Sequence, residues 1–411
     1  MKKAPLNPQK LLLSPTNSRR AQSKLGILNL HGKCLPNHIN ARQVFVGLFK
    51  KFLGGLEDFF KKSSKKTMRI LLGLSGGLDS VSAARILQSE GHEVEGALLL
   101  MTDHSSPAEA EIAAREVGIL LHIIDCREDF QKIVIGDFLA EYRRGRTPSP
   151  CTVCNRNVKM NYLHRYAMEN GFDGYATGHY CKIVQGENGR FAPVVAADRR
   201  KDQTYMLWRM TQEQFSTLHT PLADRMKADL RAEAAQLGLA AADAGESQDT
   251  CFIPEGMTCR DYLAAHIPED LTGNFVDAAG KVLGRHLGIQ YYTVGQRKGL
   301  GIALGKPAFV TKIDPTAKTV TLQFAEDTLA RRITLTDLNF VGDEPRCEGE
   351  LKRLVKIRYA APPVPATIRF EGEVATVEFD SLVRTPAPGQ SAVCYDGDRL
   401  ALGGVIDMVE Y

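Results

Sequence analysis

An apolar run that ends in two adjacent glycines constrains this chain more than any other feature. Residues 70–80 read ILLGLSGGLDS, and a helical pattern resumes at residues 81–84. We interpret the stretch as a strand, a turn and a helix. Gly76 and Gly77 allow positive φ and close approach to a ligand, so that successive N–H groups point into one concavity at a helix N-terminus. Such a concavity binds an anion, and phosphate is the expected one.

The spacing of this loop separates it from two common nucleotide motifs. A Walker A loop needs Lys followed by Ser or Thr, and the dinucleotide fingerprint does not place its glycines side by side. We expect Ser75 and Ser80 to offer hydroxyls to a phosphate, and Asp79 to place Mg²⁺ or to cap the helix. The alternative is an ordinary Gly-rich turn with a Ser cap. We favour the phosphate loop because both hydroxyls and the acid fall where such a loop needs them.

Chain length and cysteine content bound the class of protein. A chain of 411 residues with 44% hydrophobic content has room for two or three domains. Its apolar runs are shorter than a membrane-spanning helix, so we expect no membrane partner. We also expect a monomer. Nine cysteines are too few for a dense disulfide framework in a chain of this length. We therefore expect a reducing, cytoplasmic location, in which any disulfide is catalytic.

The N-terminal residues 1–67 differ from the rest of the chain in charge. They hold 14 Lys and Arg against two acids, Glu57 and Asp58, while the whole chain carries a net charge of +4. The remainder is therefore acidic, and a nucleic-acid partner must be held by local basic patches. We predict a basic, disordered leader at 1–67. It is an organelle transit peptide, which would place the protein in an organelle matrix, a nucleic-acid-binding arm, or a translated upstream stretch before a true start at Met68.

Strand and helix patterns alternate from Met68 onward. Strands are expected at residues 94–100, 119–124 and 175–178 and helices at 78–91, 107–117 and 155–169, with another helix ending near Tyr142. A capping box at Ser106–Glu109 is expected to open the second helix. This alternation predicts an α/β fold with a doubly wound parallel sheet and a ligand at the carboxyl ends of its strands.

The C-terminal half has a different texture. A hairpin is expected at residues 180–196 and helices at 203–237. Glycines punctuate short strands after residue 263, and alternating strands that include residues 355–359 predict a small β-barrel. We predict four parts: the leader 1–67, a catalytic domain 68–262, a small Gly-rich central domain 263–330 and a C-terminal β-barrel 331–411.

A pair of cysteines at Cys151 and Cys154 follows a Pro-rich loop. Because Cys154 comes just before the helix expected from residue 155, the helix dipole is expected to lower its thiol pKa. A thioredoxin-like dithiol and half a zinc site have the same spacing. Another cysteine, Cys251, lies in a polar run that begins at Gly245. The other six cysteines are expected to be filler thiols: Cys34, Cys126, Cys181, Cys259, Cys347 and Cys394.

Six motifs in one order identify a family resemblance. The chain from Met68 to its C-terminus resembles the tRNA-specific 2-thiouridylases, which are pyrophosphate-loop ATP pyrophosphatases with an adenine nucleotide α-hydrolase-like fold. The motifs are the loop at residues 73–80, Cys151 with Cys154, and the segments 176–180, 201–205, 245–253 and 292–301.

The resemblance implies a sulfurtransferase reaction. O2 of the wobble uridine of a tRNA attacks the α-phosphorus of ATP, which gives an adenylated base and pyrophosphate. A persulfide then delivers sulfur to C2 and AMP leaves. Mg²⁺ and the loop N–H groups stabilise the departing charge. Two thiols suit the second step, because one carries the terminal sulfur and the other resolves it through a transient disulfide. A cysteine desulfurase or a sulfur-relay protein is the implied persulfide donor.

The resemblance also implies roles for particular residues. Cys154 matches the nucleophile and Cys251 the persulfide carrier. ATP contacts are implied for the loop, for the backbone of one strand and for a second glycine: Gly73, Leu74, Ser75, Gly76, Gly77, Leu78, Asp79, Ser80, Leu99 and Gly178. Contacts with the target base or with tRNA are implied for three further segments: Ser149, Pro150 and Cys151; Lys201, Asp202 and Gln203; and Arg358 and Tyr359.

Cys151 departs from the family pattern, since many members carry Asp there to help proton transfer, and a thiol has a much higher unperturbed pKa. Cys151, Cys154 and Cys251 are alternatively ligands of a [4Fe–4S] cluster whose fourth iron binds sulfide. Two other functions remain open. One is a different adenylating synthetase with the same loop, such as an amide-forming ligase or a lysidine or 4-thiouridine synthetase. The other is a tRNA-binding redox or metal module.

Overall fold

The structure is a computed structural model that describes residues 66–243, 245 and 250–411. The leader predicted at 1–67 therefore lies almost wholly outside the described residues, as do residues 246–249 of the Cys251 segment. No helix in the described ranges is long and apolar enough to cross a membrane.

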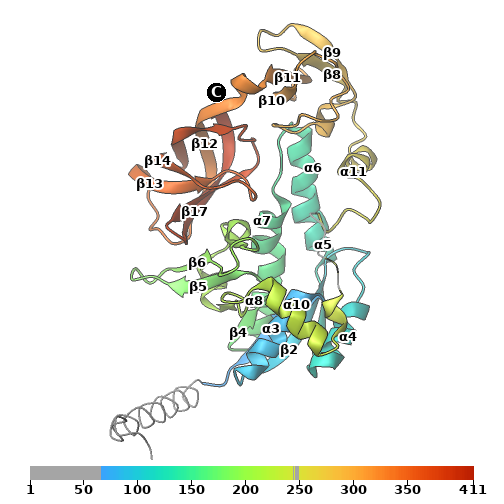
Figure 1. Ribbon diagram of the computed structural model, residues 1–411, viewed down its shortest axis with the longest axis vertical. Coiled ribbons are helices and arrows are strands. Elements are labelled where there is room, and N and C mark those ends of the chain that lie inside the picture. The colour runs from blue at the N-terminus through green and yellow to red at the C-terminus, as the bar shows by residue number, and fades with distance from the viewer. Residues whose placement is uncertain (1–65, 244, 246–249) are drawn as a thin grey trace, which may run out of the picture. The chain divides into compact units, whose positions relative to one another are not determined.

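A five-stranded parallel sheet forms the first part of the fold (Figure 1), and its strand order is β3-β2-β1-β4-β7. The strands are β1 (Arg69–Gly73), β2 (Glu93–Leu100), β3 (Leu121–Asp125), β4 (Gly174–Ala176) and β7 (Leu218–His219). The order places β1 in the middle, and the chain reaches both edges by crossing over the sheet. The predicted parallel, doubly wound sheet is confirmed.

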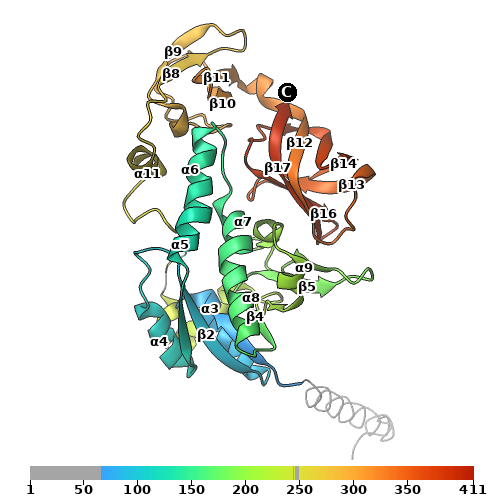
Figure 2. The ribbon, with the colours of Figure 1, turned by 180° about the vertical axis from the view of Figure 1, so that it is seen from behind.

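Successive residues of β1 face two different cores. Ile70 and Leu72 pack with α3 (Leu78–Ser89), α4 (Ala108–Val117) and α10 (Lys227–Gln236), whereas Leu71 packs on the other side with α8 (Met160–Glu169). Figures 1 and 2 view the sheet from its two sides. A central strand covered on both faces must be apolar throughout, and this explains the unbroken apolar run.

Two helical runs contain π-helical segments. The first comprises α5 (Arg127–Asp129), η1 (Phe130–Ile135) and α6 (Gly136–Arg143), and the second comprises α7 (Pro150–Cys154), η2 (Asn155–Lys159) and α8. The prediction that the second helix starts near residue 155 is wrong, because Pro150 occupies the first helical position, where a missing N–H costs nothing. Both cysteines of the pair therefore lie inside a helix.

The capping box predicted at Ser106–Glu109 is also wrong. Pro107 has helical φ and ψ, and Ser106 Oγ before it accepts the Ala108 N–H at 3.3 Å, but Ser106 and Glu109 do not exchange the reciprocal bonds that define a capping box. Capping boxes occur instead at Thr211, before α9 (Gln212–Ser216), and at Thr258, before α11 (Cys259–His266).

The C-terminal half is built from two further sheets. One has the order β10-β11-β8-β9 and comprises β8 (Gly273–Val276), β9 (Val282–His286), β10 (Ala308–Asp314) and β11 (Thr319–Phe324). The other closes into a barrel through pairing of β12 with β17. Its strands are β12 (Leu329–Phe340), β13 (Glu348–Lys356), β14 (Val364–Glu371), β15 (Val374–Arg384), β16 (Ser391–Asp396) and β17 (Arg399–Glu410). The predicted small domain and barrel are confirmed.

The remaining elements are a hairpin and short helical turns. The predicted hairpin forms as β5 (Cys181–Gln185) and β6 (Phe191–Val195), and β6 pairs with β17 of the barrel sheet. The 3₁₀ turns are η3 (Thr204–Leu207), η4 (Ala240–Ala242), η5 (Ile289–Tyr291) and η6 (Ala325–Thr328). The strand expected over residues 355–359 ends earlier, at Lys356, so Arg358 and Tyr359 lie in the turn that follows β13.

Trp208, the single tryptophan of the chain, packs against the barrel. Its ring is fully buried, and its indole N–H donates to Ser391 Oγ at 2.8 Å. The ring lies so close to Gly403 that a Cβ added there would be 2.6 Å from it. A glycine at position 403 is therefore required by space.

We predict that Gly403→Ala lowers the free energy of unfolding by about 1–3 kcal/mol, because the added methyl overlaps the indole ring. Trp208 fluorescence during urea unfolding measures the change. Gly136→Ala is the matched control, since its Cβ meets nothing closer than 3.7 Å and it lies in a helix. The control is expected to be neutral or slightly stabilising. Equal unfolding midpoints for Gly403→Ala and wild type would contradict the packing argument.

Candidate active site

The loop between β1 and α3 needs only one of its two glycines for backbone geometry. Gly76 has φ of 89°, and a Cβ there would lie 2.7 Å from the carbonyl carbon of Glu109. Gly77 is the N-cap of α3 with φ of −73°, which any residue adopts. The prediction of positive φ at Gly77 is therefore wrong. The close approach at Gly76 is to the start of α4, because the loop packs against that helix.

The two serines of the loop have different environments. Ser80 is buried, donates to the Gly77 carbonyl at 2.9 Å and accepts the Ser75 N–H at 3.3 Å, so it holds the turn closed. Ser75 is exposed, and its Oγ lies 3.4 Å from Ser80 Oγ. Ser75 is therefore the more accessible of the two hydroxyls. Gly73 is the last residue of β1, and the next residue, Leu74, is buried, as is Leu78, the first residue of α3.

Asp79 links the loop to two segments that follow much later in the chain. Tyr180 donates its hydroxyl to Asp79 Oδ1 at 2.8 Å, and Lys227 Nζ lies 3.1 Å from Asp79 Oδ2. A Cβ added at Gly178 would lie 2.8 Å from the carbonyl carbon of Asp79. The expectation that Asp79 caps α3 is wrong, because no side-chain bond caps that helix. The structure does bring Gly178 against the loop.

Burial controls the chemistry of the cysteine pair. Cys151 lies in the first turn of α7 and is exposed, whereas Cys154, one turn later, is buried. Burial raises the pKa of the Cys154 thiol to about 11, although the nearby Lys159 charge and backbone N–H act in the opposite direction. The predicted lowering by the helix dipole is therefore wrong. Cys154 is the fifth residue of its helix, beyond the first turn in which the dipole acts.

Cys251 is held in place by the residue that follows it. Phe252 is buried and makes edge contacts with Phe130, Phe138 and Tyr262 at ring-centroid distances of 6.0, 5.0 and 5.5 Å. Cys251 itself is exposed at residue level, yet partial burial still raises its thiol pKa. Negative charge on Cys151 or Cys251 would raise the pKa of Cys154, so the structure brings the three cysteines into one electrostatic neighbourhood.

Lys159 is a functional candidate that the sequence analysis missed. Its charge lowers the pKa of Cys154, of Cys251 and of His179, three groups on three different segments. Burial, followed by Lys159, lowers the pKa of His179 to about 3, and its Nδ1 lies 2.9 Å from Thr177 Oγ1. His179 is therefore neutral near pH 7. The only sequence signal for Lys159 is a basic residue five positions after Cys154.

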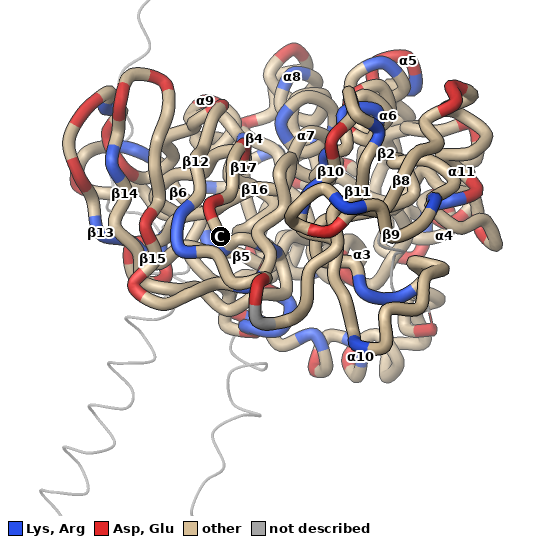
Figure 3. Tube along the Cα trace, turned by 90° about the horizontal axis from the view of Figure 1, so that it is seen from above, with Lys and Arg blue, Asp and Glu red and all other residues tan. Residues whose placement is uncertain are grey.

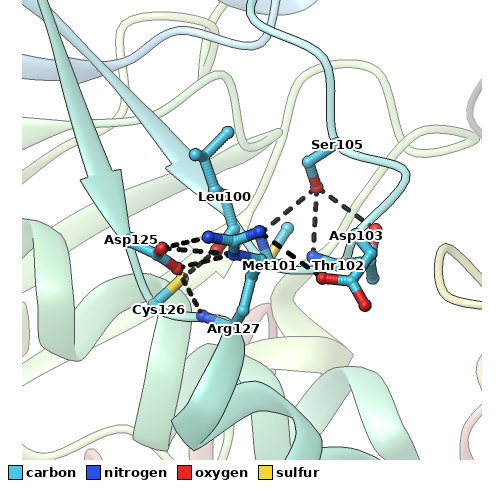
Figure 4. A network of polar contacts seen from close by, with 8 residues as sticks. All are labelled: Leu100, Met101, Thr102, Asp103, Ser105, Asp125, Cys126 and Arg127. Atoms are coloured by element: carbon cyan, nitrogen blue, oxygen red, sulfur yellow. Dashed lines mark hydrogen bonds and ion pairs between the residues drawn. The ribbon is translucent and has the colours of Figure 1, made fainter.

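Cys126, expected to be a filler thiol, lies at the edge of this group. It follows β3, is buried, and donates its S–H to the Leu100 carbonyl at 3.2 Å. Burial and, next, charge on Cys154 raise its pKa to about 12. Figure 4 shows Cys126 beside Leu100, the last residue of β2. Leu99, expected near adenine, is buried one residue earlier.

Beyond these strand ends lies a cavity of about 490 Å³. Arg127 pairs with Asp125 and with Asp103, at 3.4 Å for Asp103 (Figure 4), and holds the pKa of Asp125 at about 2. The lining includes Met101, His104, Arg127, Phe252, Tyr262 and His266. The cavity therefore borders both the β2 end and the Cys251 segment.

The barrel binds the Pro-rich loop before Cys151 through an ion pair and a hydrogen bond. Arg146 Nη1 pairs with Asp407 at 2.7 Å, and Gln390 Nε2 donates to the Pro148 carbonyl at 2.8 Å. Ser149 is the N-cap of α7 without a side-chain cap bond, and Pro150 follows it at the first helical position. The segment Ser149–Cys151 is thus fixed from the barrel side. Gln390 is another residue that the sequence analysis missed.

The other segments expected to contact tRNA meet at one place. Tyr359 donates its hydroxyl to the Asp202 carbonyl at 3.0 Å, and Lys356 Nζ lies 5.4 Å from the Tyr359 ring. Asp202 is buried and its side chain accepts the Ala196 N–H at 3.3 Å.

Two residues of these segments have internal partners. Gln203 Oε1 accepts the Tyr180 N–H at 3.0 Å, and Arg358 donates to the carbonyls of Val294 and Thr385. Lys201 is half-buried beside them. Lys and Arg are interspersed with Asp and Glu along the described chain (Figure 3).

The residues that the structure describes were compared with the side-chain groups that bind metal ions. Among them, no group of three or more His, Cys, Asp or Glu side chains can hold a metal ion. Cys151, Cys154 and Cys251 are all among the described residues, so these three thiols do not form such a group around a single metal ion. Asp79 at the loop fits Mg²⁺ in a different way, since this ion is commonly held by one or two carboxylates together with substrate phosphates.

The fold and this site define a class of protein. A Gly-rich loop follows the carboxyl end of the central strand of a parallel sheet, and two cysteines lie on α7. This is a nucleotide-binding domain of the HUP class, coupled to a small sheet and a β-barrel.

Comparisons with known proteins give the family. Three family models match, described as tRNA methyl transferase HUP domain (68–255), tRNA methyl transferase PRC-barrel domain (260–323) and aminomethyltransferase β-barrel domain (330–406). The chain is 38% identical over 363 residues to the tRNA-specific 2-thiouridylase MnmA of Geobacter metallireducens, covering 84% of this chain and 98% of that protein. It is 39% identical to MnmA of Acetivibrio thermocellus, covering 84% and 99%.

One solved structure that matches is less similar in sequence than these relatives. NMN synthetase from Francisella tularensis matches at 18% identity with a TM-score of 0.29, covering 49% of this chain and 73% of that one. The curated relatives are decisive: this chain belongs to the family of tRNA-specific 2-thiouridylases. The match to the HUP-domain family is evidence that this chain binds ATP.

We predict that the Cys154 thiol alkylates slowly near neutral pH. Because its pKa is about 11, the rate with iodoacetamide should rise about tenfold per pH unit from about pH 7 to about pH 9.5 without a plateau. Lys159→Met should lower the rate throughout this range, since the charge that favours the thiolate is lost. Peptide mass spectrometry measures labelling at Cys154 itself. Lys132→Met, at an exposed position, is the control, and a wild-type plateau near about pH 8 would contradict the burial argument.

Proposed function

We propose that this protein is a tRNA 2-thiouridylase that adenylates the wobble uridine at O2 with ATP and then replaces that oxygen with sulfur from a cysteine persulfide. AMP and pyrophosphate are released. Family membership and the paired cysteines support this activity. The description of the matching HUP-domain model names a tRNA methyl transferase, whereas the names of the curated relatives give a 2-thiouridylase. An ATP loop beside thiols suits thiolation, which needs an activated oxygen and a sulfur nucleophile.

One observation carries the proposal: the segment Gly178–Tyr180 joins the loop to the thiols. Tyr180 donates to Asp79 of the loop, and the adjacent His179 responds to the same Lys159 charge as Cys154 and Cys251. A single nucleobase between these groups would have ATP on one side and sulfur on the other. This is the arrangement that adenylation followed by thiolation requires.

In the first step the loop binds the phosphates of ATP. The α3 N-terminus and the backbone N–H groups after Ser75 attract the phosphate charge. The exposed Ser75 hydroxyl is the loop side chain best placed to donate to pyrophosphate, while Ser80 keeps the turn closed. Asp79 is the residue that would hold Mg²⁺, and this ion would add positive charge beside the leaving group. Attack by O2 breaks the bond between the α-phosphorus and the bridging oxygen.

In the second step Cys251 carries the persulfide. Its terminal sulfur attacks C2, and the C2–O2 bond breaks as AMP leaves. The Cys154 thiolate then attacks the inner sulfur of Cys251, and the electron pair of the broken S–S bond stays with the sulfur on the base. The two cysteines are left as a disulfide, which an external dithiol reduces. Burial keeps Cys154 protonated in the free protein, so proton removal is part of this step.

The remaining assignments belong to the same proposal. Ser149, Pro150 and Cys151 contact the target base, and Lys201, Asp202, Gln203, Arg358 and Tyr359 contact tRNA. Leu99 and Gly178 contact the nucleotide. A cysteine desulfurase or sulfur-relay protein loads Cys251, and the enzyme acts as a monomer in the cytoplasm. A [4Fe–4S]-dependent version of the same thiolation, with Cys151, Cys154 and Cys251 as ligands, is the alternative to this persulfide scheme.

We predict that wild-type protein forms 2-thiouridine on unmodified tRNA supplied with ATP, a persulfide donor and a dithiol. Cys251→Ser should lower the rate of thiolation at least about 100-fold. It should retain pyrophosphate release, because adenylation precedes sulfur transfer. Cys154→Ser should behave in the same way. Nucleoside mass spectrometry and a pyrophosphate assay measure the two steps separately.

Cys347→Ser is the matched control, since Cys347 is an exposed thiol in the barrel half of the chain. It should thiolate like wild type. Full thiolation by both Cys154→Ser and Cys251→Ser would refute the thiol roles. Pyrophosphate release without thiolation in the wild type would favour another adenylating synthetase.

A further inference from the structure

Lys227 places an ammonium group at the ATP loop. It belongs to α10, which lies outside the sequence motif of the loop. Its Nζ lies 3.1 Å from Asp79 Oδ2, and its side chain is only 17% exposed. Asp79 is the second residue of α3, two positions after the N-cap Gly77. The ammonium therefore lies at the helix end that would receive the phosphates.

The position of Lys227 is unfavourable for its own helix. Lys227 is the first residue of α10, where the macrodipole disfavours a cation. No side-chain cap bond opens this helix, although Asp198 accepts the Lys227 N–H at 3.1 Å. Helix formation alone would favour an acid or a neutral residue here. A lysine at this position thus indicates a requirement outside α10.

The helix that carries Lys227 packs firmly against α3. Leu230 and Ala234, one and two turns further along α10, are buried in the clusters that contain Val81 and Leu78 of α3. Figure 1 shows α10 beside α3. The base of the lysine side chain is therefore fixed relative to the loop, and only its flexible end needs to move.

We propose that Lys227 is a phosphate ligand of the loop, which neutralises Asp79 in the free protein and transfers its ammonium to the phosphate chain when ATP binds. The inference rests on the proposed function and adds a residue to its ATP site. An unpaired Asp79 carboxylate would repel the triphosphate at this distance, and the lysine removes that repulsion. Lysine suits the role because its ammonium is a point charge on a flexible stem. Transfer also frees the Asp79 carboxylate for a metal ion.

The test measures ATP binding to the full chain without tRNA, by calorimetry, once in EDTA and once with Mg²⁺. Lys227→Met should weaken binding roughly 10- to 100-fold in EDTA, which is typical of a lost charge-assisted contact. Lys227→Arg should stay within about fivefold of wild type, since it keeps the charge. Lys182→Met is the matched control, because Lys182 forms an exposed pair with Asp224 at 3.1 Å. The control should bind ATP like wild type.

A double variant separates a phosphate ligand from a merely structural ion pair. If Lys227 only balances Asp79, then Asp79→Asn combined with Lys227→Met should restore wild-type affinity in EDTA. If Lys227 binds phosphate, the double variant should remain at least about fivefold weaker than Asp79→Asn alone. Trp208 fluorescence unfolding establishes that each variant is folded, and Lys227→Arg gives the answer should Lys227→Met not fold.

The outcomes separate the two levels of inference. Affinity of Lys227→Met within about twofold of wild type, or restoration in the double variant, overturns the role of Lys227 and leaves the proposed function intact. Loss of ATP binding only in charge-removing variants supports it. Failure of the wild type to bind ATP with or without Mg²⁺ overturns the proposed function itself.

Discussion

The contact between the 178–180 segment and the first turn of α3 is the constraint on which the site depends. Gly178 approaches the Asp79 backbone so closely that a side chain would not fit, and Tyr180 donates to the Asp79 carboxylate. Both segments follow neighbouring parallel strands, β1 and β4. The sheet therefore delivers them to the same edge, and the glycine lets them touch. This approach fixes Gly178 and Tyr180 against the first turn of α3.

Burial and charge compete at the thiols, and burial prevails in the free protein. Desolvation raises the pKa of Cys154 to about 11 despite the Lys159 charge. A thiol kept protonated is poorly reactive toward oxidants and stray electrophiles. The π-helical turn that follows Cys154 ends at Lys159, and such turns are frequent at functional sites. Burial and, next, the same Lys159 charge lower the pKa of His179, so this cation acts on groups of three segments in addition to burial.

Sequence reasoning succeeded where one local pattern controls the structure. The apolar run of β1 and the glycine pair predicted a strand, a loop and a helix, because both faces of β1 are buried and only glycine fits at position 76. It failed where a distant contact decides. Pro150 starts α7 early and the core buries Cys154, which reversed the expected pKa shift. The sequence did not reveal the contact of Lys227 with the loop, because its partner Asp79 lies 148 residues away in sequence.

The barrel takes part in the geometry of the thiols although it supplies none of the three proposed reactive cysteines. Arg146 is bonded to Asp407 of β17, and Gln390 is bonded to the Pro148 carbonyl. Two residues later Pro150 begins α7, the helix that carries Cys151 and Cys154. Any displacement of the barrel must therefore either break these bonds or move the start of α7. The position of α7, and of both cysteines on it, is therefore coupled to the barrel.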